Sequence, residues 1–269
     1  MSILGLDCSN YGGVPTSEQA GFIRDAGYEY VIVGTQQESI ADRQLEAFAN
    51  VGLHLELYLY PWYDSGDKYR VERAGRLAWR YAITRVWDDI EWNAELQGPE
   101  PWHAVIIQGM KRRHDDLRAL ELDVGIYTGE PYWKRLTGNT VEFNHLPLWH
   151  AWYYNDRRIP DFDDFRPYGG WTRPLIWQYH DTNNIGGFGN DRNAAESRFW
   201  LPAQQEDDMS AEEREELAER RNAAELASAI LDRDSYRVIK MPPNVLGQDV
   251  MHVVLPDGSD SNPPIFVAV

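Results

Sequence analysis

Two carboxylates, Asp89 and Glu91, have the spacing that acid–base chemistry requires. They end an apolar run in the segment RVWDDIEW, residues 85–92. In a β-strand, alternate side chains point to the same face, and such residues have Cα atoms about 6.5–7 Å apart. Neighbouring carboxylates repel, so one tends to hold a proton near neutral pH. A protonated acid beside an ionised carboxylate cleaves glycosidic bonds; a solvated strand end or an ion pair is the competing interpretation.

The composition limits the possible partners. The chain has 269 residues, enough for one large domain or for one domain with an appendage. A net charge of −17 argues against a nucleic-acid partner and against simple attraction to anionic membranes. Its 11 Trp and 15 Tyr provide either sugar-stacking platforms or core packing.

Metal, cofactor and export signals are not evident. Cys8 is the only cysteine, which rules out a disulfide framework within the chain, and the seven His show no metal-ligand spacing. No nucleophile elbow is present, and the glycines at 186–189 lack the Lys of a phosphate loop. We therefore expect no metal and no cofactor. The start lacks a signal-peptide pattern and no apolar run approaches a membrane span, so we expect cytoplasmic synthesis and no membrane insertion.

Residues 1–196 alternate short apolar runs with helical patterns. This alternation predicts parallel strands with right-handed crossovers, hence an α/β fold. After residue 127 the helical pattern fades, which predicts a barrel that is irregular in its second half. Strands are predicted over 3–6, 30–34, 53–60, 84–90, 124–127, 146–153 and 175–179, and helices over 16–26, 40–51, 69–82 and 102–120.

Chemically capable side chains recur at the predicted strand ends. Such barrels place their catalytic residues at the carboxyl ends of the strands. This coincidence favours a catalytic interpretation of the opening pair. The residues concerned are Asp7, Tyr60, Asp89, Glu91 and Tyr127.

The remaining residues predict two further parts. Residues 197–234 read as an acidic connection followed by a helix over 210–231, which Ser210 and Glu213 begin as a capping box. Residues 235–269 predict a small β appendage for docking or targeting, with strands over 236–241, 250–255 and 265–269.

Five motifs follow one another in a characteristic order. They are GLDCSNY (5–11), DIE (89–91), GIYTG (125–129), LWHAWY (148–153), and IWQY (176–179) with a Gly-rich loop that ends in GNDRN (189–193). This order resembles glycoside hydrolase family 25, the N,O-diacetylmuramidase lysozymes, over roughly residues 3–196. The resemblance implies an irregular (β/α)5β3 TIM-like barrel. It also implies cleavage of the β-1,4 bond between N-acetylmuramic acid and N-acetylglucosamine in peptidoglycan.

The resemblance implies roles for four acids. Glu91 matches the general acid, whose pKa burial and Asp89 would both raise. Asp89 would orient the substrate's 2-acetamido group, which itself attacks the anomeric carbon. Asp7 and Asp191 would complete the acidic floor; a turn or cap for Asp7 and an Asx turn for Asp191 are the alternatives. Candidate sugar-binding residues, with core packing as the alternative for the first two, are Tyr58, Tyr60, Trp62, Tyr127, Trp149 and Tyr153.

Three features depart from the family pattern. The second strand ends in VGTQQ (33–37) where the family commonly has a Lys-Ala-Thr-Glu-like segment, the loop before Asp191 is about one residue short, and Asp88 is an extra acid.

The leading hypothesis is a phage endolysin or tail-associated lysin that reaches the wall after release or is carried in the virion, with peptidoglycan and phage tail proteins as partners. The alternative is a weak or inactive barrel that serves as a structural or glycan-binding part of a phage tail.

Overall fold

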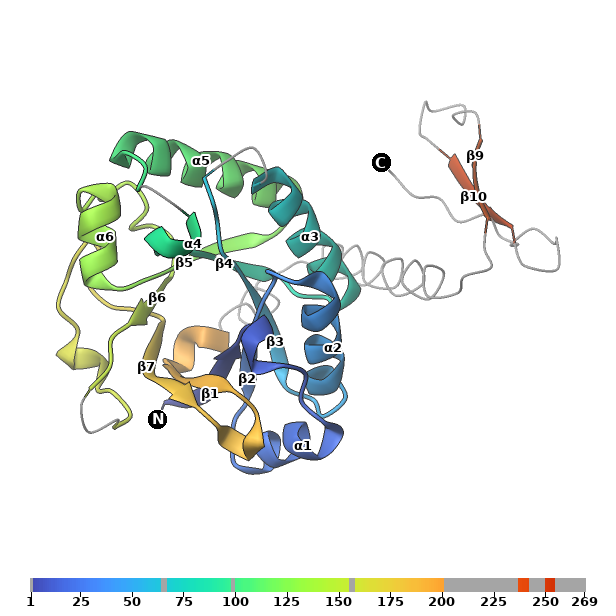
Figure 1. Cartoon of the computed structure of the whole chain (residues 1–269), viewed down its shortest axis with the longest axis horizontal. Coiled ribbons are helices and arrows are strands. Elements are labelled where there is room, and N and C mark those ends of the chain that lie inside the picture. The colour runs from blue at the N-terminus through green and yellow to red at the C-terminus, as the bar shows by residue number, and fades with distance from the viewer. Residues whose placement is uncertain are drawn as a thin grey trace, which may run out of the picture. The chain divides into compact units, whose positions relative to one another are not determined.

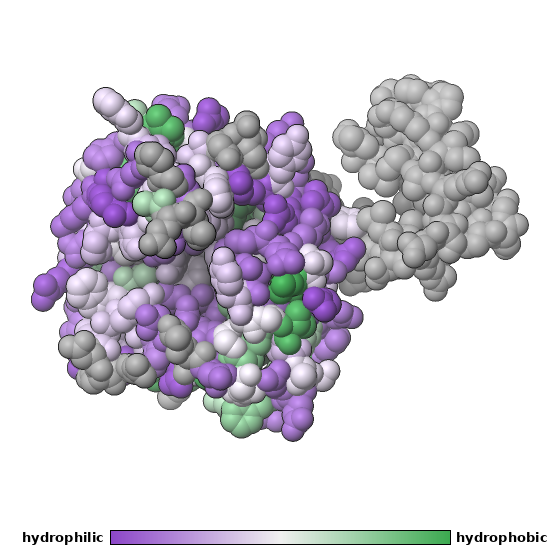
Figure 2. Space-filling model, in the orientation of Figure 1, coloured by the Kyte–Doolittle hydropathy of each residue, from purple (hydrophilic) through white to green (hydrophobic). Residues whose placement is uncertain are grey.

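The computed structural model describes residues 2–63, 67–97, 100–154, 158–200, 237–241 and 250–254. The chain divides into two compact units, residues 1–208 and 209–269. Within the described ranges, no helix combines the length and hydrophobicity that a membrane crossing requires. Figure 2 shows a mainly hydrophilic surface on the viewed face of the first unit, in keeping with the high content of charged residues.

The first unit is a closed barrel of eight strands that pair in sequence order. Neighbouring strands from β1 to β7 are parallel. The last strand, β8, is antiparallel to both β7 and β1 and closes the barrel between them. The strands are β1 (Ile3–Cys8), β2 (Tyr30–Gly34), β3 (His54–Leu59), β4 (Arg85–Asp89), β5 (Asp123–Thr128), β6 (Leu148–Ala151), β7 (Ile176–Asn183) and β8 (Asn190–Ala195).

Helices connect the first six strands and lie outside them (Figure 1). Among the residues described between β6 and β8 there is no α-helix, so the order is five strand–helix units and three strands, as predicted. The short helix α6 was missed, because it has only eight residues, with Pro131 in its first turn and a left-handed Gly138 directly after its end. The helices are α1 (Ser17–Asp25), α2 (Glu38–Ala49), α3 (Asp67–Arg80), α4 (Ala94–Gln97), α5 (His103–Ala119) and α6 (Glu130–Thr137).

Alternation along the strands separates two packing layers. One set of strand side chains packs with α1, α2 and α3, including the buried Leu6, Val33 and Leu57. The other set fills the barrel interior with large rings such as Tyr30 and Trp87. These layers bury both faces of the sheet, which explains the near-continuous apolar runs of the parallel strands.

Glycines make room for the interior rings. A Cβ on Gly5 would lie 2.1 Å from the ring of Tyr30, and a Cβ on Gly125 would lie 2.3 Å from that of Trp87. Beside Trp87, the buried Glu56 accepts a hydrogen bond from the indole nitrogen and pairs with Arg85 at 3.2 Å. The interior is therefore a packed core that supports the strand ends above it.

The second unit contains a two-stranded antiparallel sheet of β9 (Arg237–Met241) and β10 (Val250–Val254). These strands fall where the sequence predicts strands over 236–241 and 250–255. The predicted helix over 210–231 and the predicted strand over 265–269 lie outside the described residues. The three-part division of the chain and the docking role of the appendage stay predictions.

Candidate active site

The acids collect at one rim of the barrel because of its topology. Asp7 and Asp89 lie at the carboxyl ends of the parallel strands β1 and β4. β8 runs the opposite way, so its first residues reach the same rim, and its register places Asp191 directly opposite Asp7. Residues opposite one another in an antiparallel pair share a face. Asp191 is thus a strand residue and not part of a loop, which corrects the Asx-turn alternative.

Glu91 completes the group just beyond the end of β4. Pairing continues past Asp89, because the Ile90 N–H donates to the Tyr127 carbonyl at 2.8 Å. Burial, with a smaller contribution from the charge of Asp191, raises the pKa of Glu91 to about 7. The sequence predicted repulsion between Asp89 and Glu91, and this repulsion raises the pKa of Asp89; Asp191 is a further charge that raises the pKa of Glu91.

Asp89 is a buried carboxylate with one oxygen that the described residues leave unsatisfied. Its side chain is buried, and among the described residues Oδ1 has no hydrogen-bond partner. Burial raises the pKa of Asp89 well above its usual range, and the charge of Glu91 adds to this. A buried acceptor without a donor is costly, so this oxygen is suited to accept a hydrogen bond from a ligand.

Asp7 is held by two side-chain amides. The Nε2 group of Gln178 and the Nδ2 group of Asn193 each donate to Oδ1 of Asp7 at 2.8 Å. Burial and the charge of Asp191 raise the pKa of Asp7 well above its usual range, while the two amides oppose the shift. Because Oδ1 accepts both hydrogen bonds, a proton on Asp7 belongs on Oδ2.

Aromatic donors fix these amides from the other side. The hydroxyls of Tyr127 and Tyr153 donate to Oε1 of Gln178 at 2.8 and 2.6 Å. The indole Nε1 of Trp149 donates to Oδ1 of Asn193 at 2.8 Å. Neither amide was among the functional residues predicted from the sequence, although Gln178 lies in the IWQY motif and Asn193 in GNDRN. The signal was the spacing of Asn193 two positions after Asp191, which puts both on one face of β8.

The six candidate aromatics divide by exposure. Trp149 is only 1% exposed and packs against Tyr127 with ring centroids 4.3 Å apart. Tyr58 packs in the same barrel-interior cluster. No ring face of Trp149 is open to a sugar. Its predicted sugar-binding role is therefore corrected: Trp149 packs in the barrel interior and supports the acid site, and Tyr58 does the same. Three rings reach the accessible rim: Tyr60, Trp62 and Tyr153.

The extra acid, Asp88, serves the fold. It points away from the acid group and pairs with Arg113 at 2.9 Å and with His114 at 2.9 Å. Burial alone would raise the pKa of Asp88, but Arg113 and His114 outweigh it and lower the pKa. Arg113 also pairs with Asp67 at the start of α3, at 3.0 Å. The departure from the family pattern is therefore structural.

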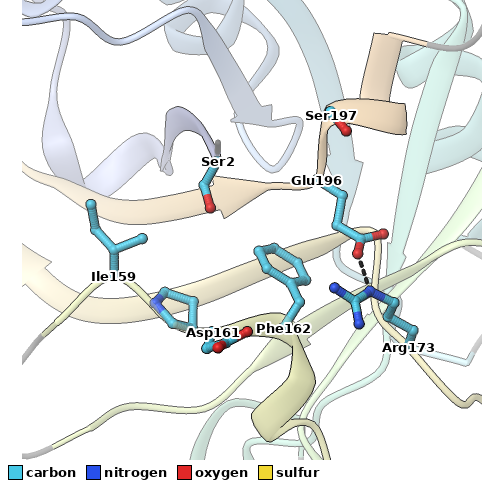
Figure 3. A pocket seen from close by; sticks show the side chains of 8 residues that line it. Ser2, Ile159, Asp161, Phe162, Arg173, Glu196 and Ser197 are labelled. Carbon is cyan, nitrogen blue, oxygen red and sulfur yellow. Dashed lines mark hydrogen bonds and ion pairs between the residues drawn. The ribbon is translucent and has the colours of Figure 1, made fainter.

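A cavity of about 420 Å³ lies away from these acids (Figure 3). It is lined by Ser2 before β1, Arg173 before β7 and Glu196 after β8, all at the opposite end of the barrel. Figure 3 shows Arg173 directed at Glu196. Among the described residues, no group of His, Cys, Asp or Glu has the arrangement of a metal site.

An acid cluster at the carboxyl rim of an α/β barrel is the arrangement of a hydrolase, and comparisons with known proteins give its class. The family model described as "Lysozyme-like protein 1" matches residues 12–179. Probable GH family 25 lysozyme 5 of Dictyostelium discoideum is 31% identical over 201 residues, which are 71% of this chain and 90% of that protein. Probable GH family 25 lysozyme 2 of the same organism is 26% identical over 75% of this chain and 92% of its own length.

Solved structures share the fold. A family GH25 lysozyme from Aspergillus fumigatus superposes with a TM-score of 0.56 at 20% identity, over 73% of this chain and 95% of its own. The bacterial lysozyme from Streptomyces coelicolor gives 0.57 at 20% identity, over 73% and 93%. The chain belongs to the lysozyme-like glycoside hydrolase family 25, and it is a glycoside hydrolase.

Proposed function

We propose that this chain is a muramidase that cleaves the β-1,4 bond between N-acetylmuramic acid and N-acetylglucosamine in peptidoglycan. The observation that carries the proposal is the meeting of Asp7, Asp89, Glu91 and Asp191 at one rim, with the pKa of Glu91 raised to about 7. A carboxyl group with this pKa holds a proton at the pH of many bacterial environments and releases it readily.

Glu91 acts as the general acid in this proposal. Below about pH 7 it is protonated and donates its proton to the glycosidic oxygen as the bond to the anomeric carbon breaks. Water then attacks the anomeric carbon, and the Glu91 carboxylate takes the proton that this water loses. The enzyme therefore returns to its starting protonation state after each turnover.

Asp89 assists the nucleophile, which is the substrate's own acetamido oxygen. The partnerless Oδ1 of Asp89 accepts the acetamido N–H, which increases the electron density on the amide oxygen. That oxygen attacks the anomeric carbon and forms a bicyclic intermediate that water opens with overall retention. Asp7 and Asp191 stabilise the positive charge that develops on the sugar ring.

Purified bacterial walls provide the test. The wild-type chain should reduce their turbidity and release fragments with N-acetylmuramic acid at the reducing end, identified by mass spectrometry after borohydride reduction. Reducing-end N-acetylglucosamine would instead indicate a glucosaminidase. If no wall preparation from several hosts is cleaved, the muramidase proposal is wrong.

The biological setting expected from the sequence stays a prediction. The relatives reported above come from Dictyostelium discoideum, and the solved structures from a fungus and a bacterium, so they do not support a phage endolysin or a tail-associated lysin. The intact acid cluster favours an active enzyme over an inactive structural barrel.

A further inference from the structure

A second cavity, of about 320 Å³, opens beside the acid rim. Two of its lining residues, Glu130 and Trp152, lie close after the carboxyl ends of β5 and β6. Because β4, β5 and β6 are parallel, these residues lie at the same end of the barrel as Asp89. The complete lining is Glu130, His150, Trp152, Tyr154, Arg158, Asp164, Arg166 and Trp177.

This cavity and the acid site share one backbone segment. Tyr153 donates to Gln178 and so belongs to the network around Asp7, whereas its neighbours Trp152 and Tyr154 line the cavity. The carbonyl of Trp152 is fixed by a 2.9 Å hydrogen bond from the indole of Trp177. Residues 152–154 therefore contribute both to the network around Asp7 and to the lining of the cavity.

Three aromatic rings, those of Trp152, Tyr154 and Trp177, and the His150 imidazole make up half of the cavity lining. Tyr154 stacks on Trp177 with centroids 5.9 Å apart and an interplanar angle of 25°. Burial lowers the pKa of His150 to about 3, so this imidazole is neutral at any working pH. Trp152 is 44% exposed and offers an open ring face. Such walls suit a ligand with short apolar side chains.

One cation of the lining is uncompensated. Arg158 pairs with Asp164 at 3.2 Å, and Glu130 pairs with Lys134 at 2.6 Å. Arg166 is exposed, and no hydrogen bond or ion pair joins it to the rest of the described chain. In a protein of net charge −17, an unpaired arginine beside the site favours a carboxylate ligand. The Figure 3 cavity differs, because its Arg173 is already paired with Asp163 and Glu196.

We propose that this cavity binds the carboxylate-bearing peptide that substitutes the muramic acid residue, with Arg166 as its anchor. The proposal rests on the muramidase function and deepens it. Peptidoglycan carries short peptides with alanine methyl groups and free carboxylates on the same sugar that the acids must engage. The aromatic walls receive the small side chains, and Arg166 binds a carboxylate. Peptide-bearing glycan is then the preferred substrate over bare glycan.

Arg166→Gln tests the proposal against a matched control, Arg112→Gln. Arg112 is likewise exposed, and no hydrogen bond or ion pair joins it to the other described residues, but it lies on α5. Each variant is assayed on intact walls and on the same walls stripped of peptides by an amidase. Arg166→Gln should raise KM on intact walls about five- to tenfold with kcat unchanged, and should leave KM on stripped walls as in the wild type. Trp152→Ala should act in the same direction.

The outcomes separate the two proposals. If Arg166→Gln matches Arg112→Gln on intact walls, or weakens both substrates equally, the peptide site is wrong while the muramidase stands. If the wild type cleaves neither substrate, the muramidase proposal fails. Co-sedimentation with intact walls then still measures how tightly each variant binds them. Weaker wall binding by Arg166→Gln than by Arg112→Gln then supports the site, and equal binding overturns it.

Discussion

Gln178 on β7 donates a 2.8 Å hydrogen bond to Asp7 on β1, although 171 positions separate them in the sequence. The amide cannot rotate without losing its other contacts, because Tyr127 and Tyr153 both donate to its oxygen. Asp7 is therefore oriented by a group whose own direction is fixed by its neighbours. Positioning of this kind is what keeps a charged group productive within a site.

Replacing Gln178 by Leu should shift the acid limb of the pH–rate profile. The amide lowers the pKa of Asp7 against the effect of burial, so its loss raises that pKa further. If Asp7 must be ionised to stabilise the transition state, half-maximal kcat on the acid side moves to higher pH. A merely structural role for Gln178 would lower kcat at all pH values without moving the limb. Gln108→Leu on the exposed face of α5 is the control.

Glu91→Gln should reduce wall cleavage about 10²–10⁴-fold, the usual contribution of a positioned acid. Binding to walls should persist, because the amide keeps the size of the side chain. In the wild type, kcat should fall as pH rises through about 7, where Glu91 loses its proton. Glu142→Gln, an exposed acid paired with Lys111, should behave as the wild type. A variant at position 91 that clears walls as fast as the wild type would contradict the assignment.

The same substitution should stabilise the protein at alkaline pH. The pKa of Glu91 rises from 4.5 to about 7 on folding, so between these values the native state binds a proton that the unfolded state lacks. Stability is then full below about pH 4.5 and is lost as pH rises towards 7. At pH 8, Glu91→Gln should gain about 1–3 kcal/mol, or roughly 3–8 °C in Tm. At pH 4.5 the gain should vanish, which thermal denaturation at both pH values can check.

Arg113→Ala should be strongly destabilising. Arg113 is 2% exposed and joins Asp88 on β4 to Asp67 on α3. Its removal takes the buried guanidinium from both acids and leaves only Arg70 beside Asp67 and His114 beside Asp88, which costs about 3–5 kcal/mol. Arg118→Ala on the same helix breaks an exposed pair with Asp115 and should cost about 0–1 kcal/mol. Equal urea midpoints for the two variants would show that Asp88 is satisfied by other groups.

The strand–helix alternation and the rim position of the acids followed from the sequence. The second strand lies at the predicted residues, and the capping box of Thr16 and Gln19 begins α1 where the pattern indicated. These features depend on local periodicity and capping, which neighbouring residues determine.

Other features depend on contacts that no local pattern reveals. β8 reads NDRNAA, with no β-branched residue, and it is a strand because β1 and β7 pair with both of its edges. The burial of Trp149 and the charge of Asp191 beside Glu91 likewise follow from closure of the barrel. The sequence motifs contain these residues but do not reveal where their side chains point.

The antiparallel closing strand also determines when activity can arise during folding. Asn193 and Asp7 are 186 positions apart, so their hydrogen bond forms only after nearly the whole barrel sequence is present. Contacts of such long range carry a high loop-closure cost and form late. A chain truncated before β8, whether on the ribosome or by proteolysis, has neither a closed barrel nor a paired Asp7. In the proposed muramidase, activity therefore requires the chain through β8, and products that end before this strand should be inactive.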